Sequence, residues 1–202
     1  MADNVQLNLG TGGDIARAKD RGTSIKTTIV GIDMAVGGTE SLLDGTVAAP
    51  AALMPTGGKI VTITQTPTVG GAAYVAKDAV GGLLTFANAA RVSGGTIIVD
   101  AVTLVDKSAT MGSYDLVLFN ATFTGPTDSS AFDPTDAELL TCVGVIPITT
   151  WADFNDNSVA SRYGLGLSIT LAGTSLFGAL VARSGFSLTN GDIQVMLAIT
   201  QN

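Results

Sequence analysis

Six aspartates are the residues of this sequence that could carry out acid–base chemistry. They fall on or beside apolar runs, and they are Asp100, Asp106, Asp115, Asp128, Asp153 and Asp156. Two carboxyl groups flanking a glycosidic bond suffice for glycoside hydrolysis, and their pairing is set in space rather than along the chain. A sugar site also needs aromatic rings for stacking, yet the 202 residues include one Trp and three Tyr. We therefore predict that the protein is not an enzyme.

The histidine and cysteine content excludes most other catalytic and metal sites. The sequence has no His, which excludes Ser-His-Asp and Cys-His catalysis and His-ligated zinc. Its single cysteine, Cys142, can form neither an intrachain disulfide nor a multi-cysteine metal site. Cys142 lies in the apolar run 139–143, where we expect it to be buried as a small apolar side chain.

Two short motifs resemble ligand-binding loops but differ from them where the ligand would bind. The GGK triplet at 57–59 resembles a phosphate loop, but Ile60 stands where Ser or Thr should hold magnesium. Asp153, Asn155 and Asn157 have the alternate spacing of a calcium loop, but a glycine occupies the position of its bidentate acid. We expect these three side chains to cap loop amides instead. The sequence predicts no cofactor.

The charge is low in density and uneven along the chain. Charged residues make up 13% of the sequence and the net charge is −7. Residues 1–26 carry four basic and three acidic residues (+1), whereas the rest carries six basic and fourteen acidic residues (−8). Nucleic-acid binding depends on phosphate neutralisation by Lys and Arg, so the acidic main body is not expected to bind DNA or RNA.

The apolar content is high for such a weakly charged chain, at 46%. A mixed charged surface keeps domains apart, so its scarcity favours stable self-association. The longest apolar stretches, such as 47–54 and 176–182, are far shorter than the ~20 residues that a membrane helix needs. The first residues show no basic-then-apolar signal pattern, so we expect synthesis in the cytoplasm and no membrane partner.

Residues 70–120 predict a series of antiparallel strands. Three Gly-Gly pairs, at 70–71, 81–82 and 94–95, divide this stretch into short runs rich in Val, Ile, Thr and Leu. Glycine adopts positive φ without steric cost, so we expect the chain to reverse at these pairs. The run Thr96–Asp106 is apolar on both faces and should be a central strand. With eight or nine strands in all, the sequence predicts an all-β, jelly-roll-like antiparallel β-sandwich.

The chain divides into two parts in this interpretation. Residues 1–55 are expected to form an extended N-terminal arm and linker, and residues 56–202 the β-sandwich. One short helix is predicted over residues 134–141, with Asp133 as its N-cap. Pro147 suggests a sheet edge or a strand end, and Asn190-Gly191 predicts a hairpin between the last two strands.

Residues 72–107 resemble a family of tailed-phage virion structural proteins. The family pattern begins with Tyr-x-x-x-Asp-x-Val/Ile-Gly-Gly and continues with Phe-x-x-Ala-x-Arg, a Gly-rich turn and a strand that ends in Asp-Lys. The matching residues here are Tyr74, Asp78, Val80, Gly81, Gly82, Phe86, Ala89, Arg91, Gly94, Gly95, Asp106 and Lys107. The likeness continues at 116–119, 131–136, 143–148 and 176–183. The segment 5–31 is similar to the start of phage head-associated proteins, with Leu9 where that family has a proline.

The resemblance implies a capsid decoration or cement protein on the exterior of the virion. Its expected partners are the major capsid protein and further copies of itself, with a trimer favoured. The arm is expected to bind the capsid through Leu7, Leu9, Ile15, Arg17, Lys19, Arg21 and Lys26. A head-fibre, tail-associated or receptor- or carbohydrate-binding virion component is the alternative. The family pattern contains no catalytic residues.

Overall fold

A computed structural model of the chain describes residues 58–202, and these form an antiparallel β-sandwich with one short helix. The all-β prediction is therefore confirmed. The elements are β1 (Lys59–Gln65), β2 (Ala73–Tyr74), β3 (Ala79–Phe86), β4 (Thr96–Asp106), β5 (Tyr114–Phe119), α1 (Asp136–Leu139), β6 (Cys142–Ile148), β7 (Ala152–Asp153), β8 (Ser158–Thr170), β9 (Leu176–Ala182), β10 (Phe186–Ser187) and β11 (Ile193–Gln201). The predicted arm, residues 1–55, lies outside the described residues.

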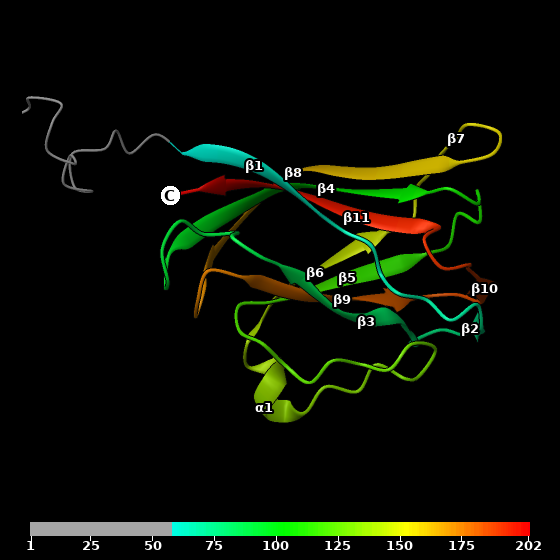
Figure 1. Cartoon of the computed structure of the whole chain (residues 1–202), viewed down its shortest axis with the longest axis horizontal. Coiled ribbons are helices and arrows are strands. Elements are labelled where there is room, and N and C mark those ends of the chain that lie inside the picture. The colour runs from blue at the N-terminus through cyan, green and yellow to red at the C-terminus, as the bar shows by residue number, and fades with distance from the viewer. Residues whose placement is uncertain (1–57) are drawn as a thin grey trace, which may run out of the picture. The chain divides into compact units, whose positions relative to one another are not determined.

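The eight long strands follow the jelly-roll order. Counted along the chain, the first pairs with the eighth, the second with the seventh, the third with the sixth and the fourth with the fifth. This is the pairing of one long hairpin rolled into two sheets. One sheet has the order β1-β11-β4-β8-β7 and the other β3-β9-β5-β6, and they lie face to face in two layers (Figure 1).

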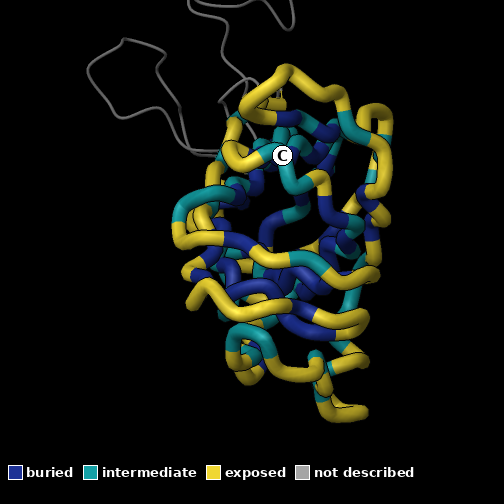
Figure 2. Tube along the Cα trace, turned by 90° about the vertical axis from the view of Figure 1, so that its right-hand side faces the viewer, coloured by how far each residue is buried: buried dark blue, intermediate teal, exposed yellow. Residues whose placement is uncertain are grey.

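The core lies between the two sheets because the strands alternate apolar and polar residues with a period of two. In β11, Ile193, Val195, Leu197 and Ile199 are fully buried, while the residues between them are half-buried. Strand β4 is the middle strand of its sheet, as predicted for 96–106. The buried residues fill the interior of the sandwich, and exposed residues mark its loops (Figure 2).

The outer face of the four-stranded sheet is covered by the chain between β5 and β6. Phe119 is fully buried there against Phe123 and Phe132, with ring centroids 4.1 and 6.4 Å away, in a second apolar cluster. The outer face is therefore buried over β5 and β9, whereas Val145 on the edge strand β6 remains exposed. Nothing comparable among residues 58–202 covers the outer face of the five-stranded sheet, which stays open.

Helix α1, in this covering segment, begins at a different residue from the one predicted. Its N-cap is Thr135 rather than Asp133, and Thr135 forms a capping box with Glu138. The backbone N–H groups of Thr124 and Thr135 donate to the Glu138 carboxylate at 2.6 and 2.8 Å and lower its pKa to about 2. The Glu138 carboxylate can accept from the Thr135 N–H in a capping box only if Thr135 is the N-cap, three residues before Glu138. This requirement explains why the helix begins later than predicted.

Two turn predictions are wrong because turn-forming residues do not always reverse the chain into a hairpin. Asn190-Gly191 does not join a hairpin, because β9 and β11 belong to different sheets and β11 already pairs with β1 and β4. Gly81 and Gly82 lie inside β3 at an irregularity in its register with β9, and the chain does not reverse there. Turn-forming residues also suit bulges and crossings between sheets. Pro147 does lie in an edge strand, β6, as predicted.

Candidate interaction surface

The seven arm residues predicted to bind the capsid lie outside the described residues. They are Leu7, Leu9, Ile15, Arg17, Lys19, Arg21 and Lys26. The structure therefore bears on the other candidates only: the aspartates, the two loop motifs and the surface of the sandwich. Within residues 58–202 no group of three Asp, Glu, Cys or His side chains could hold a metal ion, and no helix is long and apolar enough to cross a membrane.

Asp128 is a structural acceptor that joins three separate segments. Its carboxylate accepts hydrogen bonds at 2.7 Å from the backbone N–H groups of Gly70 and Gly81 and from the Tyr74 hydroxyl. Partial burial opposes the charged form, but these bonds outweigh it and hold the pKa of Asp128 below its ordinary value. Burial and the bond to Asp128 raise the pKa of Tyr74 above its usual range. The carboxylate is therefore committed to holding the fold.

Asp106 has a similar role at the end of β4. It is fully buried and accepts from the N–H and hydroxyl of Ser108, at 3.0 and 2.8 Å, and from the N–H of Met111 at 2.8 Å. These bonds close the turn that leads from β4 towards β5, a usual role for Asp in turns. Asp106 and Asp128 thus both bind segments of their own chain.

The other candidate residues are also engaged locally or exposed. Asp115 forms an ion pair with Arg183 at 3.2 Å. Asp153 is the exposed last residue of β7, and Asp156 lies in the exposed turn that follows, which the Phe154 N–H closes by donating to the Asn157 carbonyl at 2.8 Å. Cys142, predicted to be buried, is only partly buried at the start of β6. These positions do not converge on a cleft.

The most distinctive feature of the described surface is the open outer face of the five-stranded sheet. The register of β1, β11, β4 and β8 aligns its side chains in rows across the four strands. The rows are Ile60, Thr200, Ile98, Ser168; Thr62, Ala198, Ala101, Tyr163; and Thr64, Met196, Thr103, Ser161. All twelve of these side chains are uncharged, and most of them are small or β-branched. They are called the flat face below.

Charge is almost absent from this side of the sheet. Asp100 is the one charged residue at an outward position of these four strands, where β4 bulges against β8. Its carboxylate accepts a hydrogen bond from the Thr200 hydroxyl at 2.6 Å. Thr103 and Ser161 likewise bond to each other at 3.0 Å. Polar groups that are paired in this way can be covered at a lower desolvation cost than unpaired ones.

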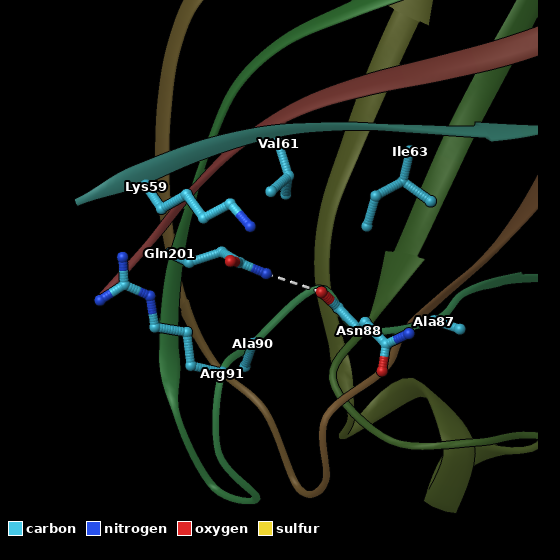
Figure 3. A pocket seen from close by; sticks show the side chains of 8 residues that line it. All are labelled: Lys59, Val61, Ile63, Ala87, Asn88, Ala90, Arg91 and Gln201. Carbon is cyan, nitrogen blue, oxygen red and sulfur yellow. Dashed lines mark hydrogen bonds between the residues drawn. The ribbon is translucent and has the colours of Figure 1, made fainter. Parts of the chain in front are cut away.

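A hollow of about 350 Å³ opens beside β1, between the two sheets (Figure 3). Val61 and Ile63 project into it from β1, with Lys59 at one end and Arg91 across from it. The Gln201 side chain crosses it and donates to the carbonyl of Asn88 at 2.7 Å. The lining therefore combines an apolar strip with amide groups and offers no carboxylate, thiol or imidazole for catalysis.

The sequence predicts partner binding by residues of the arm, and it does not predict the flat face. Its signal was present in the alternation of β1 and β11, whose outward positions are Ile, Thr, Gln, Met and Ala. Which outward residues share a face depends on the strand order and register, which the sequence alone does not provide.

Comparison with models of known protein families gave no match, and comparison with curated protein sequences gave none either. The class of protein defined by the structure is thus a jelly-roll β-sandwich whose candidate aspartates are engaged in structural bonds or lie in or beside an exposed turn.

Proposed function

We propose that this chain is a structural component of a tailed-phage virion, a decoration or cement protein that binds the major capsid protein. The observation that carries the proposal is the flat face. Adhesion to a regular lattice needs an open surface with few charges to desolvate, and this sheet offers one. The sequence resemblance at 72–107 is consistent with this role, and many repeated modest contacts would stabilise a shell.

The flat face can be tested by adding one charge at its centre. Ala198→Arg on β11 places a long cation among uncharged neighbours, which would have to be desolvated when the face is covered. We expect binding to capsids that lack this protein to weaken at least tenfold, equivalent to about 1.4 kcal/mol, in a co-sedimentation assay. The matched control is Ala137→Arg on exposed α1, on the covered side of the molecule. Equal loss in both variants, or none in Ala198→Arg, would refute the assignment.

The arm is tested separately through its basic residues. Arg17→Glu together with Lys19→Glu changes the net charge by −4 within the segment proposed to bind the capsid. We expect weaker capsid binding and a smaller dependence on salt, because exposed ionic contacts are screened. Lys77→Glu with Lys107→Glu, at two exposed positions of the sandwich, changes the charge equally and should leave binding unchanged. If both double variants bind equally weakly, net charge rather than the arm determines adhesion.

The carbohydrate-binding alternative would need an accessible aromatic ring for stacking, and the single Trp of the sequence is Trp151. The Trp151 indole N–H donates to the Gly112 carbonyl at 2.8 Å, and its ring packs edge-on against Tyr114 at 6.0 Å. An indole held in this way is poorly placed to stack on a sugar. Tyr163 is 77% exposed, but it stands on the flat face among small residues and fits the adhesion proposal equally well.

A further inference from the structure

The edge of β1 differs from the other edges of the sandwich. A free edge strand invites pairing, and proteins usually block it with a proline, a bulge or a covering segment. Strand β6 carries Pro147, β3 has a register irregularity, and β8 has β7 over its start and a bulge containing Gly164 and Gly166. Strand β1 has seven residues, an unbroken register with β11, no proline and one charge, at Lys59.

The backbone groups on the outer side of β1 can be identified from the ladder. The Asn202 N–H donates to the Thr96 carbonyl, so the groups of Gln201, one residue earlier, face β1. Gln201 is opposite Lys59, and alternation then directs the groups of Ile60, Thr62 and Thr64 away from β11. The Thr64 carbonyl accepts a hydrogen bond from the side chain of Gln65, as expected for an acceptor outside the ladder. In the described part of the chain, no strand pairs with this side of β1.

We propose that β1 pairs antiparallel with β1 of a second copy, about a two-fold axis at Thr62. In this register the outward-facing backbone groups of Thr62 meet those of Thr62 in the other copy, and Ile60 meets Thr64. Lys59 is opposite Gln65, so no like charges meet, although both copies carry a net charge of −7. The pairing would join the two five-stranded sheets into one continuous sheet, the same mode by which strands add to an exposed edge.

The side chains of β1 that line the hollow also favour a second copy of the chain as the partner. Val61 and Ile63 are only partly buried and line the hollow beside β1. A period of two places Val61 opposite Ile63 of the second copy on this inner side, so each copy would cover the exposed part of the other's apolar strip. On the outer side Ile60, which is 71% exposed, would gain the Thr64 methyl group as a neighbour. The proposal does not depend on capsid binding, and it concerns the isolated protein.

The test uses a charge at the proposed axis in the full chain. Wild-type protein is expected to sediment with the mass of two chains over a dilution series. Thr62→Lys and Thr62→Glu each place like charges opposite one another, and each should weaken the dimer about tenfold or more. Mixing the two variants should restore the dimer as a heterodimer. A monomeric wild type, a trimer, or a dimer that Thr62→Lys leaves intact would overturn the proposal.

Controls separate pairing from folding and from general surface charge. Ser168→Lys lies on the same face of the sheet but in β8, away from the β1 edge, and should leave the dimer unchanged. Each variant should keep the wild-type thermal unfolding midpoint of the monomer at high dilution. If Ser168→Lys dissociates the dimer as strongly as Thr62→Lys, the contact is the flat face and not the edge.

Cross-linking provides a second readout that does not require dissociation. Directly opposite residues in a hydrogen-bonded antiparallel pair have Cα atoms about 5.5 Å apart, within disulfide range. In a Cys142→Ser background, Thr62→Cys should therefore form a covalent dimer on mild oxidation, whereas Ser168→Cys should not. Absence of the Thr62→Cys dimer, or equal cross-linking at both positions, would contradict the two-fold pairing.

Discussion

Replacing Asp128 by alanine is expected to destabilise the sandwich by roughly 3 kcal/mol. The change removes the acceptor for two backbone N–H groups, at Gly70 and Gly81, and for the buried Tyr74 hydroxyl. Hydrogen bonds to a charged acceptor contribute about 1.5–3 kcal/mol each, and partial exposure of Asp128 allows water to replace some of them. Urea unfolding followed by circular dichroism measures the difference in the free energy of unfolding.

The stability that Asp128 provides should depend on pH in a defined direction. Its pKa in the folded state lies below the ordinary value, so the unfolded chain binds the proton more readily. The contribution is therefore complete above the unfolded pKa of about 3.9 and disappears as the pH falls through the lower folded value. Asp128→Ala should flatten this acid limb of the stability curve.

Asp133→Ala is the control for this prediction. Asp133 is exposed in the same covering segment and, among the described residues, holds no comparable set of amides. We expect its replacement to change the free energy of unfolding by no more than about 0.5 kcal/mol. If Asp128→Ala were as mild as this control, Asp128 would not be holding its three segments together.

The architecture of this protein could be predicted largely from local patterns. Apolar residues recur at every second position of Lys59–Gln65 and Ile193–Gln201 in the sequence, and the structure turns this set of residues inward in both strands. Pro147 correctly indicated an edge strand, and 96–106 the central one. These predictions succeeded because each depends on a single strand and on the environment of its two faces.

The predictions that failed depend on which strands meet. Asn190-Gly191 has the composition of a hairpin turn, but tertiary pairing assigned its flanking strands to different sheets. The reach of Asp128 to Tyr74, 54 positions away, has no trace in local sequence. The flat face is of the same kind, because four strands from distant parts of the chain contribute to it. Long-range register decides all three.

Gly81→Ala is expected to cost roughly 2–4 kcal/mol in the free energy of unfolding. Gly81 has φ of +75°, which costs a residue with a Cβ about 1–2 kcal/mol. That Cβ would lie 2.7 Å from Cβ of Pro67 and 3.2 Å from its Cα, so the backbone must move as well. Overpacking of this kind typically adds about 1–3 kcal/mol. Thermal and urea unfolding should both report the loss.

Substitutions at Gly94 and Gly82 separate the cost of the positive φ from the cost of the close contact. A Cβ on Gly94, whose φ is +74°, would meet no heavy atom within 4 Å, so Gly94→Ala should show the cost of the dihedral alone, about 1 kcal/mol. Gly82→Ala has neither problem, since the nearest atom to its Cβ would be the Pro126 carbonyl oxygen at 3.7 Å, and it should be close to neutral. The expected order of destabilisation, from largest to smallest, is Gly81→Ala, Gly94→Ala, Gly82→Ala.

If Gly81→Ala merely matched Gly94→Ala, the close approach to Pro67 would cost no free energy and β3 would be free to shift. The Gly-Gly pair at 81–82 would then be a flexible joint, whereas a large loss at Gly81 alone marks it as a rigid bulge whose N–H is held by Asp128.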